Sequence, residues 1–161
     1  MAKKKPEPGK VTDLRFGGLK FQVKKLYEDS KLPTRAYQYD AGWDFYARVH
    51  KEGSVVYQGE VAKIPLGVAS ALPPGYCWQV WDRSGVASKK KLGKLAGLID
   101  CGYRDEMTLV VVNFGTEPQM IEPGQKVCQM VIVPCPEFSL EEVQELPPSD
   151  RGERGFGSSD K

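Results

Sequence analysis

Short apolar segments follow one another along most of the chain, beginning at about Leu19. They are rich in β-branched and aromatic residues and are bounded by proline, glycine or polar residues, which is typical of strands in all-β proteins. The clearest segments are Phe21–Leu26, Val61–Ile64, Tyr76–Trp81, Thr108–Val112 and Val127–Val133. No long amphipathic helix interrupts the series. The pattern therefore predicts an all-β barrel or sandwich.

Turns and one short helix complete the predicted elements. Proline or glycine, which suit the restricted or positive φ values of turns, marks three turns. They are Lys51–Gly53, Leu72–Gly75 and Glu122–Gly124. A helix is predicted over Gly85–Leu92, with Ser84 as its N-cap and lysines in its last turn, where they complement the helix dipole.

The chain divides into three parts. Residues 1–18 are predicted to be a flexible N-terminal extension, because they begin with charged residues and lack the apolar stretch of a secretory signal. Residues 19–135 carry the β pattern and form the core. Residues 136–161 are acidic and contain proline, and they are predicted to be an arm that leads out of the core.

Composition narrows the class of protein. The 161 residues are 40% hydrophobic and contain no apolar run long enough to span a bilayer, which predicts one domain with no membrane segment. With 23 basic and 21 acidic residues, no dedicated nucleic-acid surface is expected. Four cysteines without a Cys-x-x-Cys pair, together with the single histidine His50, argue against a zinc site and a disulfide framework, and they favour a reducing cytoplasm.

The C-terminal tail has the chemistry of a nucleotide lid. It contains the run Arg151-Gly-Glu-Arg-Gly-Phe-Gly-Ser-Ser-Asp160. Arginine grips phosphate oxygens, glycine lets backbone N–H groups approach an anion, and a phenylalanine ring stacks on a base. The alternative for such a composition is a disordered terminus.

Two further segments suggest a phosphate site and a base. Arg83-Ser84-Gly85 lies between a predicted strand and the short helix, where guanidinium, hydroxyl and N–H groups can converge on an anion. The alternative is a simple helix cap. Asp100 follows an apolar run and precedes Tyr103, which suits a carboxylate that takes a proton from water beside a ring that packs on a sugar. The alternative is an ordinary turn with a half-buried tyrosine.

A second carboxylate, Asp44, lies among the aromatic residues of Tyr39–Ala47. A carboxylate in that setting needs hydrogen bonds or the water shell of a cation. The structural alternative is that Asp44 fixes the turn at Ala41–Gly42. Gln129 adds an amide on the last strong strand and indicates little by itself.

Taken in order, five segments resemble the trimeric all-β dUTPase family from about Leu19 to the C-terminus. The segments are Ala41–Ala47, Arg83–Gly85 with Lys89, Gly97–Asn113, Gly124–Gln129 and Arg151–Ser159. The resemblance implies a distorted jelly-roll barrel with one short helix. It also implies a homotrimer with shared active sites, in which the C-terminal arm is exchanged between subunits.

The same resemblance implies the activity: hydrolysis of dUTP to dUMP and pyrophosphate, which limits uracil in DNA and supplies dUMP. Asp100 would activate the water that attacks the α-phosphorus, and Tyr103 would exclude a 2′-hydroxyl. Asp44 would hold Mg²⁺ through a water molecule. The other implied substrate-binding residues are Arg83, Ser84, Gly85 and Gln129 for the phosphates, Gly97, Leu98 and Ile99 for uracil, and Arg151, Phe156, Gly157, Ser158 and Ser159 in the lid.

Several positions depart from the family pattern. Asp105 stands where glycine is usual, Trp43 where tyrosine is expected, and Arg154 where the arm has glycine, while Asp82 precedes Arg83. Two alternatives stay open: a dCTP deaminase or bifunctional deaminase-dUTPase, and a nucleotide-gated regulator with an unknown protein partner.

Overall fold

The structure, a computed structural model, describes residues 19–150 and 152. This part of the chain contains eleven strands and one helix, so the prediction of an all-β fold with one short helix is confirmed. The strands are β1 (Gln22–Lys25), β2 (Trp43–Tyr46), β3 (Ser54–Val56), β4 (Val61–Pro65), β5 (Val68–Ala71), β6 (Tyr76–Asp82), β7 (Leu92–Lys94), β8 (Leu98–Asp100), β9 (Thr108–Asn113), β10 (Gln119–Ile121) and β11 (Lys126–Pro134). The helix is α1 (Ser84–Lys90), which is too short to cross a bilayer, and none of the described residues forms a longer one.

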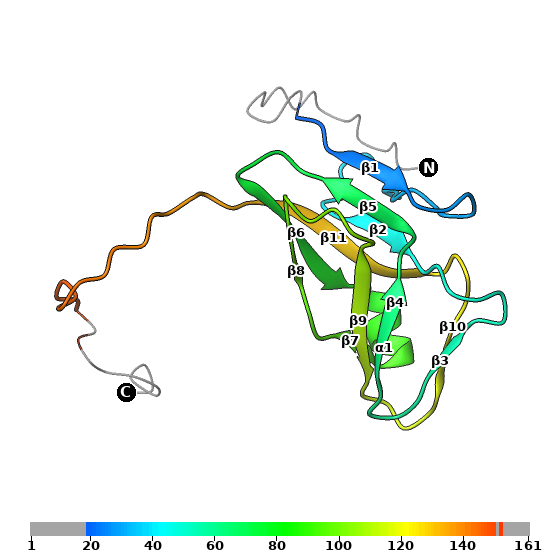
Figure 1. Cartoon of the computed structure of the whole chain (residues 1–161). Helices are drawn as coiled ribbons and strands as arrows, with labels where there is room; N and C mark the ends of the chain where they lie inside the picture. The colour runs from blue at the N-terminus through cyan, green and yellow to red at the C-terminus, as the bar shows by residue number, and fades with distance from the viewer. Residues whose placement is uncertain (1–18, 151, 153–161) are drawn as a thin grey trace, which may run out of the picture.

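The strands form a distorted jelly-roll barrel (Figure 1). A four-stranded sheet has the order β2-β11-β6-β8, and a three-stranded sheet has the order β4-β9-β7. Two pairs, β1-β5 and β3-β10, complete the described sheets, and every pairing is antiparallel. Segments far apart in the sequence therefore become neighbours, above all β2 and β6 on the two sides of β11.

Trp78 lies at the centre of the core. Its side chain is fully buried, and its ring meets Phe21 and Phe45 edge-on, with centroid distances of 5.1 and 5.6 Å. Its indole N–H donates to the Ser70 hydroxyl at 3.0 Å, which satisfies the one polar group that it buries. These contacts fix the middle of β6, the strand that leads into α1.

The helix begins one residue earlier than predicted. Arg83, with φ −81° and ψ 133°, is the N-cap, so the prediction of Ser84 in that role is wrong. The helix also ends earlier, at Lys90, because Lys91 adopts a left-handed conformation (φ 56°) and Leu92 enters β7, where its side chain is buried. The predicted lysines of the last turn, Lys89 and Lys90, are confirmed.

Beyond β11 the chain leaves the barrel. Figure 1 shows residues 136–150 running away from it as an extended arm without helix or strand. Phe138, Leu140 and Leu146 on this arm are each more than 80% exposed. Such exposure of large apolar side chains in one segment is typical of a surface that contacts another protein surface.

Candidate functional site

One face of the four-stranded sheet carries several of the residues singled out by the sequence. Side chains of directly paired residues share one face of a sheet. One row across β2, β11 and β6 consists of Asp44, Gln129 and Trp81. A second row across β11, β6 and β8 consists of Val133, Cys77 and Asp100. Asp44 and Gln129 of the first row and Asp100 of the second therefore lie on one face of the sheet, and each row carries one group of site residues.

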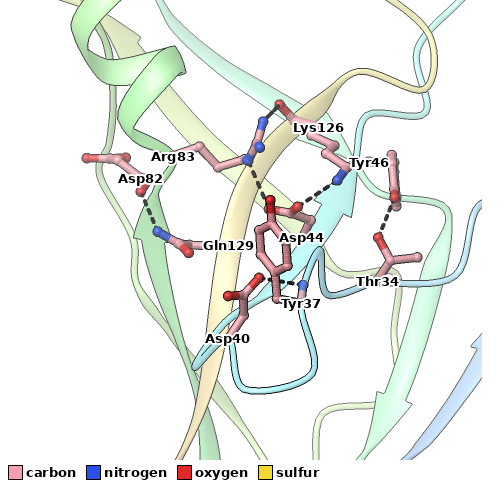
Figure 2. A network of polar contacts seen from close by, with 9 residues as sticks. All are labelled: Thr34, Tyr37, Asp40, Asp44, Tyr46, Asp82, Arg83, Lys126 and Gln129. Carbon is pink, nitrogen blue, oxygen red and sulfur yellow. Dashed lines mark hydrogen bonds and ion pairs between the residues drawn. The ribbon is translucent and has the colours of Figure 1, made fainter. Parts of the chain in front are cut away.

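Asp44 is the centre of the first group. Its carboxylate forms an ion pair with Arg83 Nε at 2.9 Å and accepts a hydrogen bond from Lys126 Nζ at 2.8 Å (Figure 2). The Asp44 side chain is 13% exposed, so the two cations offset the cost of burying its charge. The hydrogen bond to Asp44 raises the pKa of Lys126 above its usual value.

The alternative role for Asp44, fixing the turn before β2, is not what the structure shows. In that loop Asp40 accepts the hydrogen bond from the Tyr37 backbone N–H at 2.9 Å (Figure 2). Lys126 was not predicted as a site residue. It lies 82 residues from Asp44 in the chain, and only the pairing of β2 with β11 brings them together.

Arg83, Ser84 and Gly85 form the start of α1 beside this group. Arg83 directs Nε to Asp44, and its Nη1 lies 3.5 Å from the Lys126 carbonyl oxygen. Ser84 and Gly85 are exposed, and the first N–H groups of a helix have no partner within the helix. A Cβ on Gly85 would meet nothing within 4 Å, so its backbone is open to a ligand.

Gln129 belongs to the same group. Its side-chain Nε2 donates to the Asp82 carbonyl oxygen at 3.2 Å, which turns the amide toward the end of β6 (Figure 2). Gly42 makes room for it, because a Cβ at that position would lie 2.9 Å from Gln129 Oε1. The structure therefore brings Asp44, Arg83 and Gln129 together, as the sequence analysis expected.

Asp100 and Tyr103 form the second group. They line a pocket of about 230 Å³ together with Leu98, Ile99 and Thr108. Asp100 is exposed at the end of β8. The Tyr103 hydroxyl donates to the Glu106 carbonyl oxygen at 3.1 Å, which holds the ring at the pocket wall.

Arg104 stabilises the turn between these two residues. Its Nη1 lies 2.6 Å from the Cys101 carbonyl oxygen and 3.0 Å from that of Tyr103. A third carbonyl, that of Ser70 on β5, lies 3.4 Å away. The Arg104 guanidinium thus connects the turn that follows Asp100 to β5.

The predicted uracil-reading segment, Gly97–Ile99, lies at a sheet edge. β8 pairs with β6 on one side only among the described residues, which leaves backbone N–H and C=O groups on its other side open. The Gly97 carbonyl is not among the open groups, because it accepts from the Val80 N–H at 2.8 Å.

The two groups do not meet within one protomer. Asp44 and Asp100 are three strands apart across the sheet and four residues apart along it. With strands ~4.8 Å apart and a rise of ~3.3 Å per residue, their Cα atoms lie roughly 20 Å apart. None of Asp44, Arg83 and Gln129 lines the pocket of Asp100.

The departures at Asp105 and Asp82 have simple explanations. Asp105 has no positive φ, since Lys91 is the one described non-glycine residue with that conformation, so no glycine-type torsion is required. Its carboxylate accepts from the Glu106 N–H at 2.7 Å. Asp82 turns to β7 and accepts from the Lys94 N–H at 2.9 Å, so it forms no ion pair with Arg83.

Trp43 anchors the end of β2. The Arg35 guanidinium lies 4.7 Å from the centroid of the Trp43 ring, and Phe21 meets that ring edge-on. The larger ring therefore packs between Arg35 in the loop before β2 and Phe21, the residue that precedes β1.

The predicted lid residues Arg151, Phe156, Gly157, Ser158 and Ser159 lie outside the described residues, as does Arg154. The same holds for residues 1–18. The predictions for these segments stay predictions.

The described residues suit magnesium that arrives with its water shell and the substrate. They include no cluster of three His, Cys, Asp or Glu side chains that could enclose a metal. Both carboxylate oxygens of Asp44 already accept from a cation, but each keeps a lone pair that can accept from a metal-bound water. Asp44 thus fits an outer-sphere role, since Mg²⁺ usually keeps several waters.

Comparison with known proteins gives one family. The dUTPase family model matches residues 28–160. A deoxyuridine 5′-triphosphate nucleotidohydrolase of Clostridium tetani is 39% identical over 142 residues, which cover 87% of this chain and 96% of that protein. The corresponding protein of Clostridium acetobutylicum is 41% identical over 140 residues, covering 86% of this chain and 94% of that one.

Solved structures agree with the sequence relatives. The dUTPase of Staphylococcus bacteriophage 80alpha with dUpNHpp has a TM-score of 0.75 and 32% identity, covering 87% of this chain and 98% of that one. A mutant dUTPase from phage phi11 of S. aureus, described with a structural Mg(II) ion, has a TM-score of 0.73 and 28% identity, covering 80% and 99%.

Proposed function

The chain belongs to the dUTPase family and is a dUTP nucleotidohydrolase, and we propose how its residues divide the hydrolysis of dUTP to dUMP and pyrophosphate. The observation that carries the assignment is the pocket at the end of β8, where an exposed carboxylate and a fixed tyrosine ring lie side by side. The expected compartment remains the cytoplasm, which suits a protein whose cysteine pattern shows no disulfide framework.

Asp100 is the general base. Its carboxylate accepts a proton from a water molecule while that water attacks the α-phosphorus and pyrophosphate leaves. The Arg104 bonds to the turn support this role, because they hold Asp100 and Tyr103 at a fixed separation before substrate arrives. No covalent enzyme intermediate is needed.

Tyr103 and the edge of β8 set specificity. The Tyr103 ring would pack on the deoxyribose, where its fixed position leaves no room for a 2′-hydroxyl. The backbone groups on the free edge of β8, those of Leu98 among them, would bond the edge of uracil. A strand edge reads a flat base through hydrogen bonds that the wrong base leaves unpaired.

Arg83, Ser84, Gly85 and Gln129 bind the phosphates. Arg83 offers its terminal nitrogens to the α- and β-phosphates while Nε stays on Asp44. Asp44 would hold Mg²⁺ through a water molecule, and the ion would supply charge neutralisation beside the phosphates.

The functional unit is a homotrimer with shared sites. The separation of about 20 Å between Asp44 and Asp100 supports this arrangement, since one nucleotide cannot contact both groups of a single protomer. Asp100 and Tyr103 of one protomer would therefore face Arg83 and Gln129 of another. The exposed apolar side chains of the arm support its exchange onto a neighbouring protomer, where Arg151, Phe156, Gly157, Ser158 and Ser159 close the site.

A substrate panel tests the proposal. With Mg²⁺ present, pyrophosphate release from dUTP should exceed that from UTP, dCTP and dTTP by more than about 100-fold in kcat/KM. Asp100→Asn should lower kcat by about 1000-fold while a non-hydrolysable dUTP analogue still binds. Equal rates with dUTP and UTP, or normal turnover by Asp100→Asn, would overturn the assignment. Ammonia release from dCTP would instead favour the deaminase alternative.

A second candidate function is nucleotide-gated regulation of a protein partner. The solved dUTPases of phage 80alpha, 30–32% identical, include ones described as controlling transfer of virulence genes by a G protein-like mechanism. For this chain, the distinguishing observation is a partner that is retained only in one nucleotide state. Retention that is the same with and without the analogue argues against gating.

A further inference from the structure

Two thiols meet where the arm leaves the barrel. Cys77 is on β6, and Cys135 directly follows β11. Their Sγ atoms lie 2.7 Å apart, with the Cys135 thiol donating to Cys77. Carbon atoms, which are smaller than sulfur, pack best at ~3.5–4.0 Å, so the two sulfurs are already closer than ordinary packing contacts.

The backbone explains why the sulfurs meet. Val133 is the register partner of Cys77, and the Cys135 N–H donates to the Gly75 carbonyl oxygen at 2.7 Å. Cys77 and Cys135 therefore lie on the same face of adjacent antiparallel segments, two residues out of register. Long or polarisable side chains at such diagonal positions are within reach of each other.

We propose that Cys77 and Cys135 are a reversible modification site, which a low-molecular-weight disulfide oxidises to an intramolecular disulfide that fastens the root of the arm to β6. The described fold supports the location. Asp100 is the register partner of Cys77 on the other side of β6, so the bond would lie between the catalytic edge and the arm (Figure 1). The inference does not depend on the proposed catalytic roles.

The chemistry proceeds by two exchanges. The thiolate of Cys135, the more exposed of the pair, attacks one sulfur of the small disulfide and displaces a small thiolate, which takes up a proton. Cys77 then loses its proton and attacks Cys135 Sγ, which releases the second small thiol. Two protein S–H groups become one S–S bond, and one small disulfide becomes two thiols.

Burial favours the oxidised state once it has formed. Cys77 is 3% exposed, and burial raises the pKa of its thiol to about 11. A protein disulfide is a weaker oxidant, and is therefore harder to reduce, when no low-pKa thiolate stabilises its reduced form. The other two cysteines lack this geometry: Cys128 is buried in the core, and Cys101 lies in the turn after Asp100.

Oxidised and reduced glutathione mixtures test the proposal on the full-length protein. Oxidation should reduce the number of titratable thiols from four to two, and peptide mapping should join Cys77 to Cys135 within one chain. The melting temperature should rise by about 5 °C and return after reduction, because the bond closes a long loop. Hydrogen exchange at the Cys135 amide should slow by tenfold or more, since the bond opposes local opening.

Matched variants separate this site from the other thiols. Cys101→Ser should form the same disulfide, whereas Cys77→Ser and Cys135→Ser should show no rise in melting temperature. Peptide mapping of the oxidised wild-type protein tests the proposal even if one of these variants folds poorly. A stable glutathione adduct on Cys135, a disulfide between chains, or four thiols remaining under oxidising conditions would overturn the proposal. Loss of dUTP hydrolysis would not, because no readout uses turnover.

Discussion

At the scale of single residues, Lys126 gains a role from its contact with Asp44 that the sequence alone did not predict. It shares Asp44 with Arg83, so the three side chains together carry one positive charge. Without Lys126 the Asp44 carboxylate is balanced by Arg83 alone, and the cluster becomes neutral. A neutral cluster attracts a triphosphate less strongly.

We therefore expect Lys126→Met to raise the KM for dUTP by about tenfold, which corresponds to about 1.4 kcal/mol of binding, with a smaller effect on kcat. Lys126→Arg should restore most of the affinity because it keeps the charge. Lys31→Met is the matched control. The Nζ atoms of Lys31 and Lys126 both lie over the Tyr46 ring, 5.4 and 5.9 Å from its centroid, but Lys31 forms no ion pair with Asp44. Steady-state kinetics would contradict the role of Lys126 if both Met variants had the same KM.

Residue chemistry was predictable where the contacts are local. The Arg83–Gly85 segment and the Asp100–Tyr103 segment each lie within a few residues of chain, and the sequence analysis identified both. The contact of Asp44 with Lys126 and that of Cys77 with Cys135 were not predictable, because 82 and 58 residues separate the members of these pairs. Strand order, which decides those pairings, has no signal in a single sequence.

At the scale of elements, glycine turns show what sets the connections between strands. Gly53 and Gly59 both have positive φ values, 85° and 70°. A Cβ on Gly59 would meet nothing within 4 Å, whereas one on Gly53 would lie 2.9 Å from the Ile121 carbonyl oxygen on β10. The first position is restricted by torsion alone, and the second also by space.

Gly59→Ala should accordingly lower the free energy of unfolding by about 1–2 kcal/mol, the cost of a left-handed alanine. Gly53→Ala should lower it by a further ~1–3 kcal/mol, because the backbone of β10 must move. Urea denaturation at one fixed protein concentration measures both, since oligomer stability depends on concentration. Equal midpoints for the two variants would show that the paired strands β3 and β10 can move apart at Gly53 without a cost in stability.

Elements were predictable in proportion to their length and apolar content. Each of the five predicted strand segments overlaps a strand of the structure, with bounds that agree to within one residue, and Gly53, Gly75 and Gly124 in the three predicted turns have positive φ. Six strands lie outside these five segments: β3, β7, β8 and β10, of three residues each, and β2 and β5, of four. Short strands are defined by their partners, and Ser70 interrupts the apolar run of β5 because it serves the buried Trp78.

At the scale of the whole molecule, the arm is the part that the barrel does not explain. Truncation after Pro148 removes the predicted lid but keeps Phe138, Leu140 and Leu146, whose exposure indicates an intersubunit contact. The truncated chain should stay trimeric by light scattering. Its kcat for dUTP should fall by roughly 100-fold or more, because lid groups no longer order the triphosphate. Normal turnover by the truncated chain would contradict the proposed role of the last residues as a lid. Dissociation of the truncated protein into monomers would mean that these residues also stabilise the assembly.

The separation between the two polar groups leads to the sharpest test of the assembly. Asp100→Asn lacks the base, and Arg83→Ala lacks the phosphate ligand, so each homotrimer should be nearly inactive. Arg83 and Asp100 lie about 20 Å apart by strand register in one protomer. If each site takes these residues from different protomers, unfolding and refolding the two variants together should restore about a quarter of the wild-type sites. In an equal mixture about half of the chains carry an intact Arg83 and the other half an intact Asp100. A randomly assembled site therefore receives both intact residues in about one case in four. In the control, each variant is refolded alone, and the two products are then combined in the same proportions under conditions in which subunits do not exchange. If one protomer supplied both residues, the refolded mixture would be no more active than its components, and the shared site would be wrong.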